Sequence, residues 1–275
     1  MVTTFREKLR AAQGAHHSWL CVGLDPVMSR LPEAVRSAER PLVAFGRTIV
    51  ENTAGLVCAY KPNLAFWLAE GADGVRALRQ VLEMIPDHLP IILDAKFNDV
   101  GHTAQAYARA AFETLGVDAV TLNPYLGLDT LRPFLCVPER GAFLLARTSN
   151  PSAPQFQDLE VQGHALFVEV ARRATLWQEE LVGTCGLVVG ATYPQELERV
   201  RELAPQLPFL IPGIGAQGGD LGTAVEHGPT ADGVGPVINS SRGIIYASSG
   251  PDFGSAARGA ALRLRDRINQ QRGGR

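Results

Sequence analysis

The sequence is poor in cysteine and carries no strong excess of charge of either sign. Its four cysteines stand far apart, without the short spacings of zinc or redox sites, so we expect buried, reduced thiols at Cys21, Cys58, Cys136 and Cys185. The 26 basic and 28 acidic residues leave a formal net charge of −2, which gives no overall attraction to nucleic acid or to an anionic membrane. An anionic ligand therefore needs a local binding site.

Long apolar runs, internal repeats and segments of low complexity are also missing. No run approaches the ~18 apolar residues of a membrane span, and the opening MVTTFREKLRAA is charged and lacks the apolar centre of a signal peptide. Glycine and proline, with 28 and 18 residues, are too few for a disordered or collagen-like chain. We therefore expect a single cytoplasmic domain over residues 1–275.

Eight short apolar runs, each followed by a longer amphipathic stretch, set the expected fold. Such strand–helix alternation predicts parallel strands covered on both faces. Eight units of this kind close a (β/α)8 TIM barrel over about residues 19–250, with a C-terminal helix and basic tail over 251–275. An open, doubly wound sheet is the alternative, but the first run does not end in the glycine fingerprint typical of that fold. The runs are 19–24, 55–60, 90–95, 117–123, 141–147, 185–190, 208–212 and 232–238.

The residues that end these runs are unusually polar. In a barrel of parallel strands, the chemistry gathers at the carboxyl ends of the strands. One charge at such a place is explained equally well as a salt bridge on the rim, because loops are polar in any case. Several charges that converge on one end favour a functional site. The residues at the strand ends include Asp25, Lys61, Asp94, Lys96, Asn123, Arg147 and Ser149.

The densest group of charges lies in LDAKFNDVGHT, residues 93–103. Asp94 and Lys96 are two residues apart on one strand, so their side chains should point to the same face, into the mouth of the barrel. A lysine flanked by carboxylates stays protonated and can give a proton to a developing anion. Asp99 and Thr103 follow at helical spacing, although Asn98 or Asp99 would also serve as the cap of the next helix.

Three connections in the second half of the chain are candidates for ligand binding. The loop at 212–219 is rich in glycine and contains Gln217, and the loop at 239–243, Asn-Ser-Ser-Arg-Gly, contains Arg242. Both lie where barrels commonly bind phosphate. Glycines alone would indicate only tight turns. The polar segment 148–163 is long for a connection in a compact domain and is typical of a lid or binding loop.

These segments together resemble the orotidine 5′-phosphate decarboxylase family, in particular its longer bacterial subgroup. The likeness covers about residues 20–250. The Asp-x-Lys-x-x-Asp pattern alone is shared with other sugar-phosphate enzymes, whereas its combination with Lys61 and the Gln217 loop is specific. Phe97-Asn98 and Ser241 depart from the usual family residues, which concerns local loop geometry only. The matching segments are Gly23-Leu24-Asp25-Pro26, Tyr60-Lys61-Pro62-Asn63, residues 94–100 with Thr103, Asn123-Pro124-Tyr125, Thr148-Ser149-Asn150, residues 212–217 and Ser241-Arg242.

The resemblance implies decarboxylation of orotidine 5′-monophosphate to uridine 5′-monophosphate without cofactor or metal, the last step of pyrimidine nucleotide synthesis. It implies that Lys96 protonates C6 of the pyrimidine, that Asp94 faces the substrate carboxylate, and that Lys61 belongs to the same charged group. It also implies a homodimer in which Asp99 and Thr103 complete the partner's site. The implied substrate contacts are Asp25 at the ribose, Ser149 at the pyrimidine, and Pro212, Gln217, Ser241 and Arg242 at the phosphate.

Two other functions are compatible with parts of the sequence. A keto-sugar-phosphate decarboxylase of the same superfamily would use magnesium, but it needs a carboxylate at the end of the second strand, where this chain has Lys61. A nucleotide-binding barrel without activity would have no need of buried aspartates. No nucleic-acid or membrane partner is expected, and the roles of Asn63, Asn123 and His102 are left open.

Overall fold

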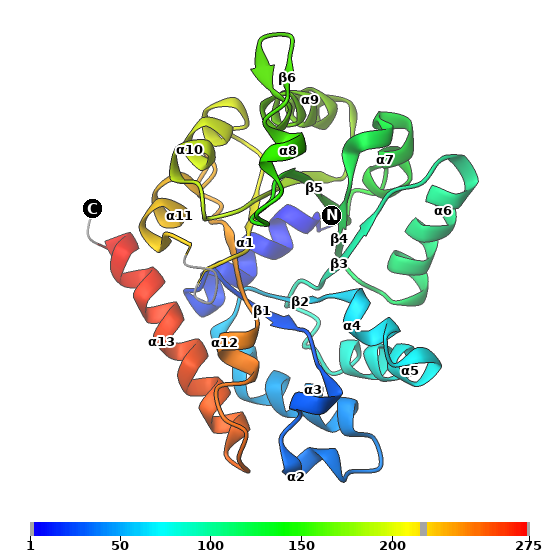
Figure 1. Cartoon of the computed structure of the whole chain (residues 1–275), viewed down its shortest axis with the longest axis vertical. Helices are drawn as coiled ribbons and strands as arrows, with labels where there is room; N and C mark the ends of the chain where they lie inside the picture. The colour runs from blue at the N-terminus through cyan, green and yellow to red at the C-terminus, as the bar shows by residue number, and fades with distance from the viewer. Residues whose placement is uncertain (1–2, 215–218, 274–275) are drawn as a thin grey trace.

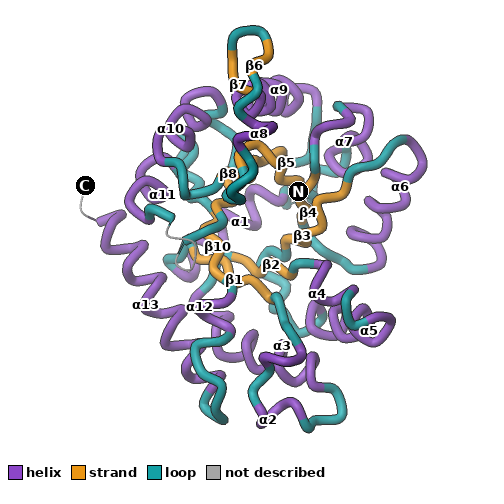
Figure 2. The backbone as a smooth tube through the Cα atoms, viewed as in Figure 1, coloured by secondary structure: helices purple, strands orange, loops and turns teal. Residues whose placement is uncertain are grey.

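Eight parallel strands form a closed barrel in the computed structural model, which describes residues 3–214 and 219–273. The strands follow the order β2-β1-β10-β9-β8-β5-β4-β3 around the sheet. Bridges from Tyr60 to Ile91 and from Asn63 to Asp94 join β2 to β3 and close the circle (Figure 1 and Figure 2). Each predicted run overlaps one strand, so the predicted TIM barrel is confirmed. The strands are β1 (Leu20–Leu24), β2 (Ala59–Pro62), β3 (Ile92–Phe97), β4 (Ala119–Leu122), β5 (Gly141–Arg147), β8 (Thr184–Val189), β9 (Phe209–Ile211) and β10 (Val237–Ser240).

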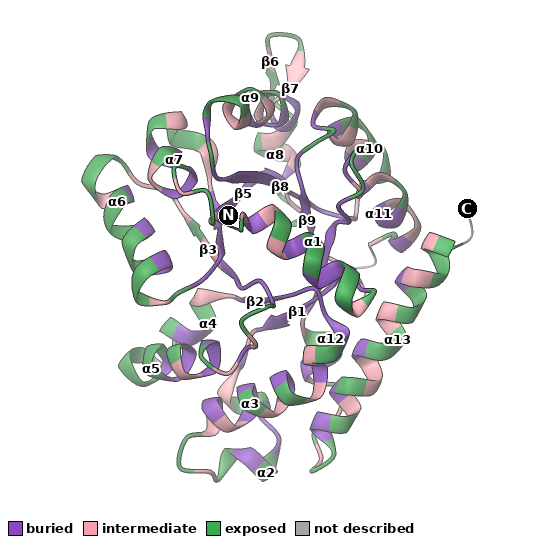
Figure 3. Ribbon diagram, turned by 180° about the vertical axis from the view of Figure 1, so that it is seen from behind, coloured by how far each residue is buried: buried purple, intermediate pink, exposed green. Residues whose placement is uncertain are grey.

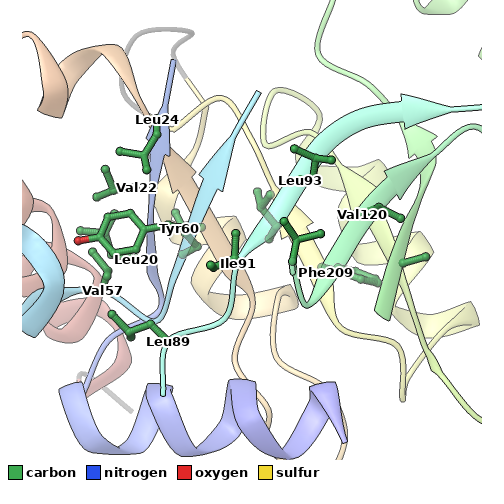
Figure 4. Packing of buried hydrophobic residues seen from close by; sticks show 14 of the residues in the cluster. Leu20, Val22, Leu24, Val57, Tyr60, Leu89, Ile91, Leu93, Val120 and Phe209 are labelled. Carbon is green, nitrogen blue, oxygen red and sulfur yellow. The ribbon is translucent and has the colours of Figure 1, made fainter. Parts of the chain in front are cut away.

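Helices surround the barrel and cover the outer faces of its strands (Figure 1). Leu20, Val22 and Leu24 of β1 pack in the core between strands and helices (Figure 4). Cys21 belongs to the core inside the barrel. Burial on both faces explains why the strands read as continuous apolar runs. The helices are α2 (Glu33–Arg36), α3 (Pro41–Thr53), α4 (Leu64–Leu68), α5 (Gly71–Leu82), α6 (Gly101–Arg109), α7 (Leu128–Leu135), α9 (Leu166–Glu180), α10 (Pro194–Leu203), α11 (Leu221–His227), α12 (Arg242–Ile245) and α13 (Phe253–Gly273).

The N-terminal helix α1 (Phe5–His16) lies across the amino-terminal end of the barrel, as the view from behind shows (Figure 3). A capping box between Thr4 and Glu7 starts this helix. Phe5 is fully buried, and its ring meets the ring of Phe143 edge-on at 5.9 Å inside the barrel. A Cβ atom on Gly141 would stand 2.7 Å from the Phe5 ring, so the glycine makes room for it. Because this end is filled, the carboxyl ends of the strands remain the open side.

Two strands begin four or more residues later than predicted, whereas the other boundaries agree within two residues. The second strand begins at Ala59 rather than at residue 55, because Ala54–Leu56 form a 3-10 turn that continues α3. The eighth barrel strand begins at Val237 rather than at residue 232. Residues 230–234 form a turn instead, in which the amide of Thr230 donates to the carbonyl of Val234 at 2.9 Å. Apolar content alone does not separate a strand from the buried chain that leads into it.

The expected burial of all four cysteines is wrong at one position. Cys21, Cys58 and Cys185 are buried, and all four thiols are free, but Cys136 is exposed where it ends α7. Burial raises the pKa of the Cys21 and Cys185 thiols to about 12, which keeps them protonated at neutral pH. Within the described ranges, no helix is both long and apolar enough to span a membrane.

The segment 148–163 contains short elements of its own. Helix α8 (Pro154–Gln157) is followed by strand β6 (Glu160–Val161), which pairs with β7 (His164–Ala165) as a small antiparallel hairpin. In Figure 2 the hairpin projects at the top of the molecule, beyond the ring of helices. The connection between β5 and α9 therefore has regular secondary structure.

Candidate active site

Three charged side chains meet at the carboxyl ends of β2 and β3; we call Lys61, Asp94 and Lys96 the charged array. The Nζ atom of Lys61 donates to Oδ2 of Asp94 at 2.8 Å, and Nζ of Lys96 donates to Oδ1 at 2.5 Å. One carboxylate thus holds two ammonium groups. The expectation that Asp94 and Lys96 face the barrel mouth together agrees with this pairing.

Solvent exposure within the charged array increases from Lys61 and Asp94 to Lys96. The side chains of Lys61 and Asp94 are 5% and 11% exposed, whereas that of Lys96 is 48% exposed. Burial lowers the pKa of Lys61, but the carboxylates of Asp94 and Asp25 outweigh it and raise the pKa above the usual 10.5. Burial raises the pKa of Asp94, but the ammonium groups of Lys61 and Lys96 lower it to about 2. Lys61 and Asp94 are therefore both charged at neutral pH.

The backbone of Lys96 is not that of a regular strand. Its φ angle is +52°, in the left-handed region, and the pairing of β3 with β4 shifts register between Leu93 and Phe97. The hydroxyl of Thr121 on β4 supports this irregularity, because it accepts from the Lys96 amide at 2.9 Å and donates to Oδ1 of Asp94 at 3.0 Å. Strained backbone held by its surroundings is common at functional sites.

Asp25 and Asn63 connect the array to the end of β1. The amide of Asn63 donates to Oδ1 of Asp25 at 3.2 Å, and the Asn63 side chain lies 3.5 Å from Oδ2 of Asp94. The Asn63 side chain also accepts from the amide of Ala65, and so caps α4. Asp25 thus stands close enough to contribute to the raised pKa of Lys61.

A cavity of about 420 Å³ opens above the array. Ser149 and Pro212, both predicted from the sequence, are among its lining residues. Sequence reasoning missed Thr121 and Gln157. Thr121 could have been found, because strand alternation places it on the same face as Asn123 at the end of the run. The lining residues are Lys61, Asp94, Lys96, Thr121, Leu145, Thr148, Ser149, Asn150, Gln157, Val188, Leu210 and Pro212.

The predicted phosphate end is only partly described. Ser241 lies beside β1, where a Cβ atom on Gly23 would stand 1.7 Å from the Ser241 hydroxyl oxygen, so this close approach requires the glycine. Arg242 begins α12 and is exposed. Neither residue is among the described residues that line the cavity. Gln217 lies outside the described residues.

Asp99 and Thr103 lie apart from this cavity. Both are partly exposed at the start of α6, and neither is among its described lining residues. Asp99 does not cap α6, because its carboxylate accepts from the amide of Val100, the residue that precedes the helix. His102 is exposed on the same helix. Over the described ranges there is no group of three or more His, Cys, Asp or Glu side chains that could hold a metal ion.

The barrel and the charged cavity at its open end define a TIM-barrel enzyme. Residues 18–253 match the model of the orotidine 5′-phosphate decarboxylase / HUMPS family, and the chain belongs to this family. It is 50% identical to an orotidine 5′-phosphate decarboxylase of Thermomicrobium roseum over 98% of this chain and 96% of that protein. A relative of the same name from Cellvibrio japonicus is 47% identical over 98% and 99% of the two chains.

A solved structure of the OMP decarboxylase of Leishmania donovani has the same architecture. It superposes with a TM-score of 0.85 at 39% identity and covers 98% of both chains. The family resemblance read from the motifs is therefore confirmed. The roles of the individual site residues stay predictions.

Proposed function

We propose that the protein decarboxylates orotidine 5′-monophosphate to uridine 5′-monophosphate and carbon dioxide, the last step of pyrimidine nucleotide synthesis. Curated relatives of that name, similar over nearly the whole chain, support the reaction. The single structural observation that carries the proposal is the sharing of the Asp94 carboxylate by Lys61 and Lys96 at one cavity. The expected cytoplasmic location stays a prediction.

The chemistry of the substrate explains the need for such an array. When the bond from C6 to the carboxylate breaks, the electron pair stays in the plane of the ring, where the π system cannot accept it. A fixed ammonium at C6 stabilises this carbanion and then gives it a proton. Lys96, at the open end of the array, is the residue we assign to this role. Carbon dioxide leaves, and the proton from Lys96 takes its place on C6.

Asp94 orients the ammonium of Lys96 for this step, and Lys61 keeps Asp94 ionised. Asp94 accepts from Nζ of Lys96 and so fixes the direction of the ammonium. Lys61 lies beneath Asp94 and keeps the carboxylate ionised, as the lowered pKa of Asp94 indicates. The carboxylate also faces the place of the substrate carboxylate, and their repulsion is relieved when carbon dioxide leaves.

The homodimer and the phosphate site belong to the same proposal. Asp99 and Thr103 are partly exposed and do not line the cavity of their own chain, which suits residues that complete a partner's site. The phosphate lies far from C6, so its binding energy can stabilise the closed, reactive complex. We assign Arg242 to this phosphate.

Replacement of Arg242 by alanine tests the phosphate assignment. The loss of a charged hydrogen bond of about 1.5–3 kcal/mol should lower kcat/KM for orotidine monophosphate about 10- to 150-fold. With the phosphate-free nucleoside orotidine as substrate, wild type and variant should have equal kcat/KM. Arg263→Ala, a change at an exposed arginine of α13, is the matched control. An equal loss on both substrates would contradict the assignment.

A chelator experiment separates the proposal from its magnesium-dependent alternative. At the end of the second strand, the Lys61 side chain is buried and paired with Asp94, and a buried ammonium there repels a divalent cation. We expect chelator-treated protein to consume orotidine monophosphate at the same rate as untreated protein. The measurement is the decrease in the ultraviolet absorbance of the substrate. Loss of activity that magnesium restores would favour the alternative, and binding without any turnover would favour a nucleotide-binding barrel.

A further inference from the structure

Arg147 is a buried cation at the end of β5 that does not face the site cavity. Leu145 and Phe143, two and four residues before it, face the interior of the barrel. The pairing of β5 with β8 shifts register between Leu145 and Arg147, and this irregularity breaks the alternation. The Arg147 side chain is 1% exposed, and its guanidinium lies over the rings of Tyr193 and Phe167, 4.5 and 5.3 Å from their centroids.

Two carboxylates from different parts of the chain meet this guanidinium. Glu196 of α10 accepts two hydrogen bonds, one from Nε and one from Nη2, the latter at 3.0 Å. Asp158, in the segment 148–163, places Oδ1 2.8 Å from Nη1, with the distance of an ion pair but not the direction of a hydrogen bond. The Glu196 side chain is 24% exposed and that of Asp158 is 45% exposed.

The two contacts differ in what their loss would cost. Glu196 binds the planar guanidinium through both oxygens, which is the strong arrangement for this pair. Asp158 makes a more exposed contact without hydrogen-bond direction, of the kind that contributes little to the stability of the fold. If Asp158 moves away, Arg147 keeps a charged partner and is not left as an isolated buried cation. Loss of the Asp158 contact alone therefore has a small cost and leaves the barrel intact.

Two hydrogen bonds next to the Arg147–Asp158 pair join the two ends of a loop that lines the cavity. The amide of Thr148 donates to Oε1 of Gln157 at 3.0 Å, and Nε2 of Gln157 donates to the Thr148 hydroxyl at 2.7 Å. The ion pair and these two hydrogen bonds thus join residues 147–148 to residues 157–158, and the chain between them forms a closed loop. Ser149, Asn150 and Gln157 in this loop line the site cavity.

We propose that Arg147 is a positioning residue, which, held by Glu196, pairs with Asp158 and so keeps residues 148–158 closed over the cavity. The claim that residues 148–158 are held closed depends only on these contacts. The effect on turnover rests on the proposed function, because it needs orotidine monophosphate as the substrate.

The test compares three variants of the full-length protein. Asp158→Asn removes the charge that meets Arg147. Glu160→Gln removes the same charge two residues away, from an exposed side chain with no ion pair among the described residues, and is the control. Asp158→Glu restores a carboxylate. Amide hydrogen exchange of the substrate-free proteins and steady-state kinetics with orotidine monophosphate are measured for each.

In Asp158→Asn, amides within 148–158 should exchange about three- to fivefold faster, since the lost pair contributes about 1 kcal/mol or less, and exchange elsewhere should be unchanged. KM should rise by a similar factor with little change in kcat. Glu160→Gln should behave as wild type, and Asp158→Glu should recover most of the loss. Equal exchange in Asp158→Asn and Glu160→Gln would overturn the proposal, and so would faster exchange with an unchanged KM. If wild type does not turn over this substrate, the proposed function fails, and the exchange result alone decides on the closed loop.

Discussion

Replacing Lys96 by alanine should lower kcat/KM for orotidine monophosphate by far more than the 10²- to 10³-fold that follows loss of one neutral oxyanion donor. The substitution removes both the positive charge beside the carbanion and the proton that C6 receives. Asp94 then faces the substrate carboxylate with only Lys61 to balance it. Because both effects act on the transition state, we expect the loss mainly in kcat.

The folded protein should tolerate this change. The Lys96 side chain is 48% exposed, and Asp94 keeps its bonds from Lys61 and Thr121. Thermal unfolding and binding of uridine monophosphate should therefore stay close to wild type, while substrate absorbance no longer decreases. A variant that retains more than about a tenth of the wild-type rate would exclude Lys96 as the proton donor.

Mixing this variant with a second one tests the dimer at the same time. If Asp99 acts in the partner's site, a dimer of one Lys96→Ala chain and one Asp99→Ala chain contains one complete site. Random reassociation of equal amounts should then restore about a quarter of the wild-type sites. No recovery, with dimer exchange verified by mass, would leave Asp99 outside the partner's site.

The parts of this molecule that follow from local patterns were predictable from the sequence. Strands buried on both faces give continuous apolar runs, which is why the barrel was found. Polar residues at the ends of those runs are visible as interruptions, so Lys61, Asp94 and Lys96 were located as a group. The boundaries were less certain, since buried turns such as 54–56 are as apolar as the strand that follows.

Contacts that depend on irregular backbone were not predictable. Alternation along β3 correctly predicted that Lys96 faces the barrel mouth. It did not predict that Lys96 itself has a left-handed backbone, which Thr121 supports through a hydrogen bond. At β5 the same rule points Arg147 toward the cavity, where the register shift instead directs it to Glu196 and Asp158. A rule with a period of two carries no information about where a strand breaks that period.

Asp94→Asn should have the second large effect, because it affects both the stability of the fold and the reaction. Asparagine keeps the shape and an oxygen acceptor, but Lys61 becomes a buried cation without its main counter-charge. Breaking a buried pair in this way costs about 3–5 kcal/mol, and the retained acceptor favours the lower end. Asp73→Asn, at an exposed pair with Arg76 whose side chains are 89% and 70% exposed, should change the free energy of unfolding by less than about 0.5 kcal/mol.

The pH dependence of this difference follows from the two pKa shifts. The pKa of Asp94 falls from 3.8 to about 2 on folding, so its stabilisation is present above 3.8 and is lost as the pH falls toward 2. The pKa of Lys61 is raised above 10.5, so its stabilisation is present below 10.5 and is lost as the pH rises beyond the raised value. Urea unfolding should therefore show the full difference between wild type and Asp94→Asn from about pH 4 to about pH 10, and a smaller one at pH 3.

The kinetics of the same variant separate the two roles given to Asp94. If the carboxylate only directs the Lys96 ammonium, kcat falls and KM is unchanged, because substrate binding does not involve that direction. If it also repels the substrate carboxylate before reaction, KM falls together with kcat, since asparagine removes the repulsion from the bound substrate. A fall in kcat by about two orders of magnitude or more is expected in both cases, because a misdirected ammonium stabilises the carbanion poorly. An unchanged kcat would show that Lys96 finds its position without Asp94.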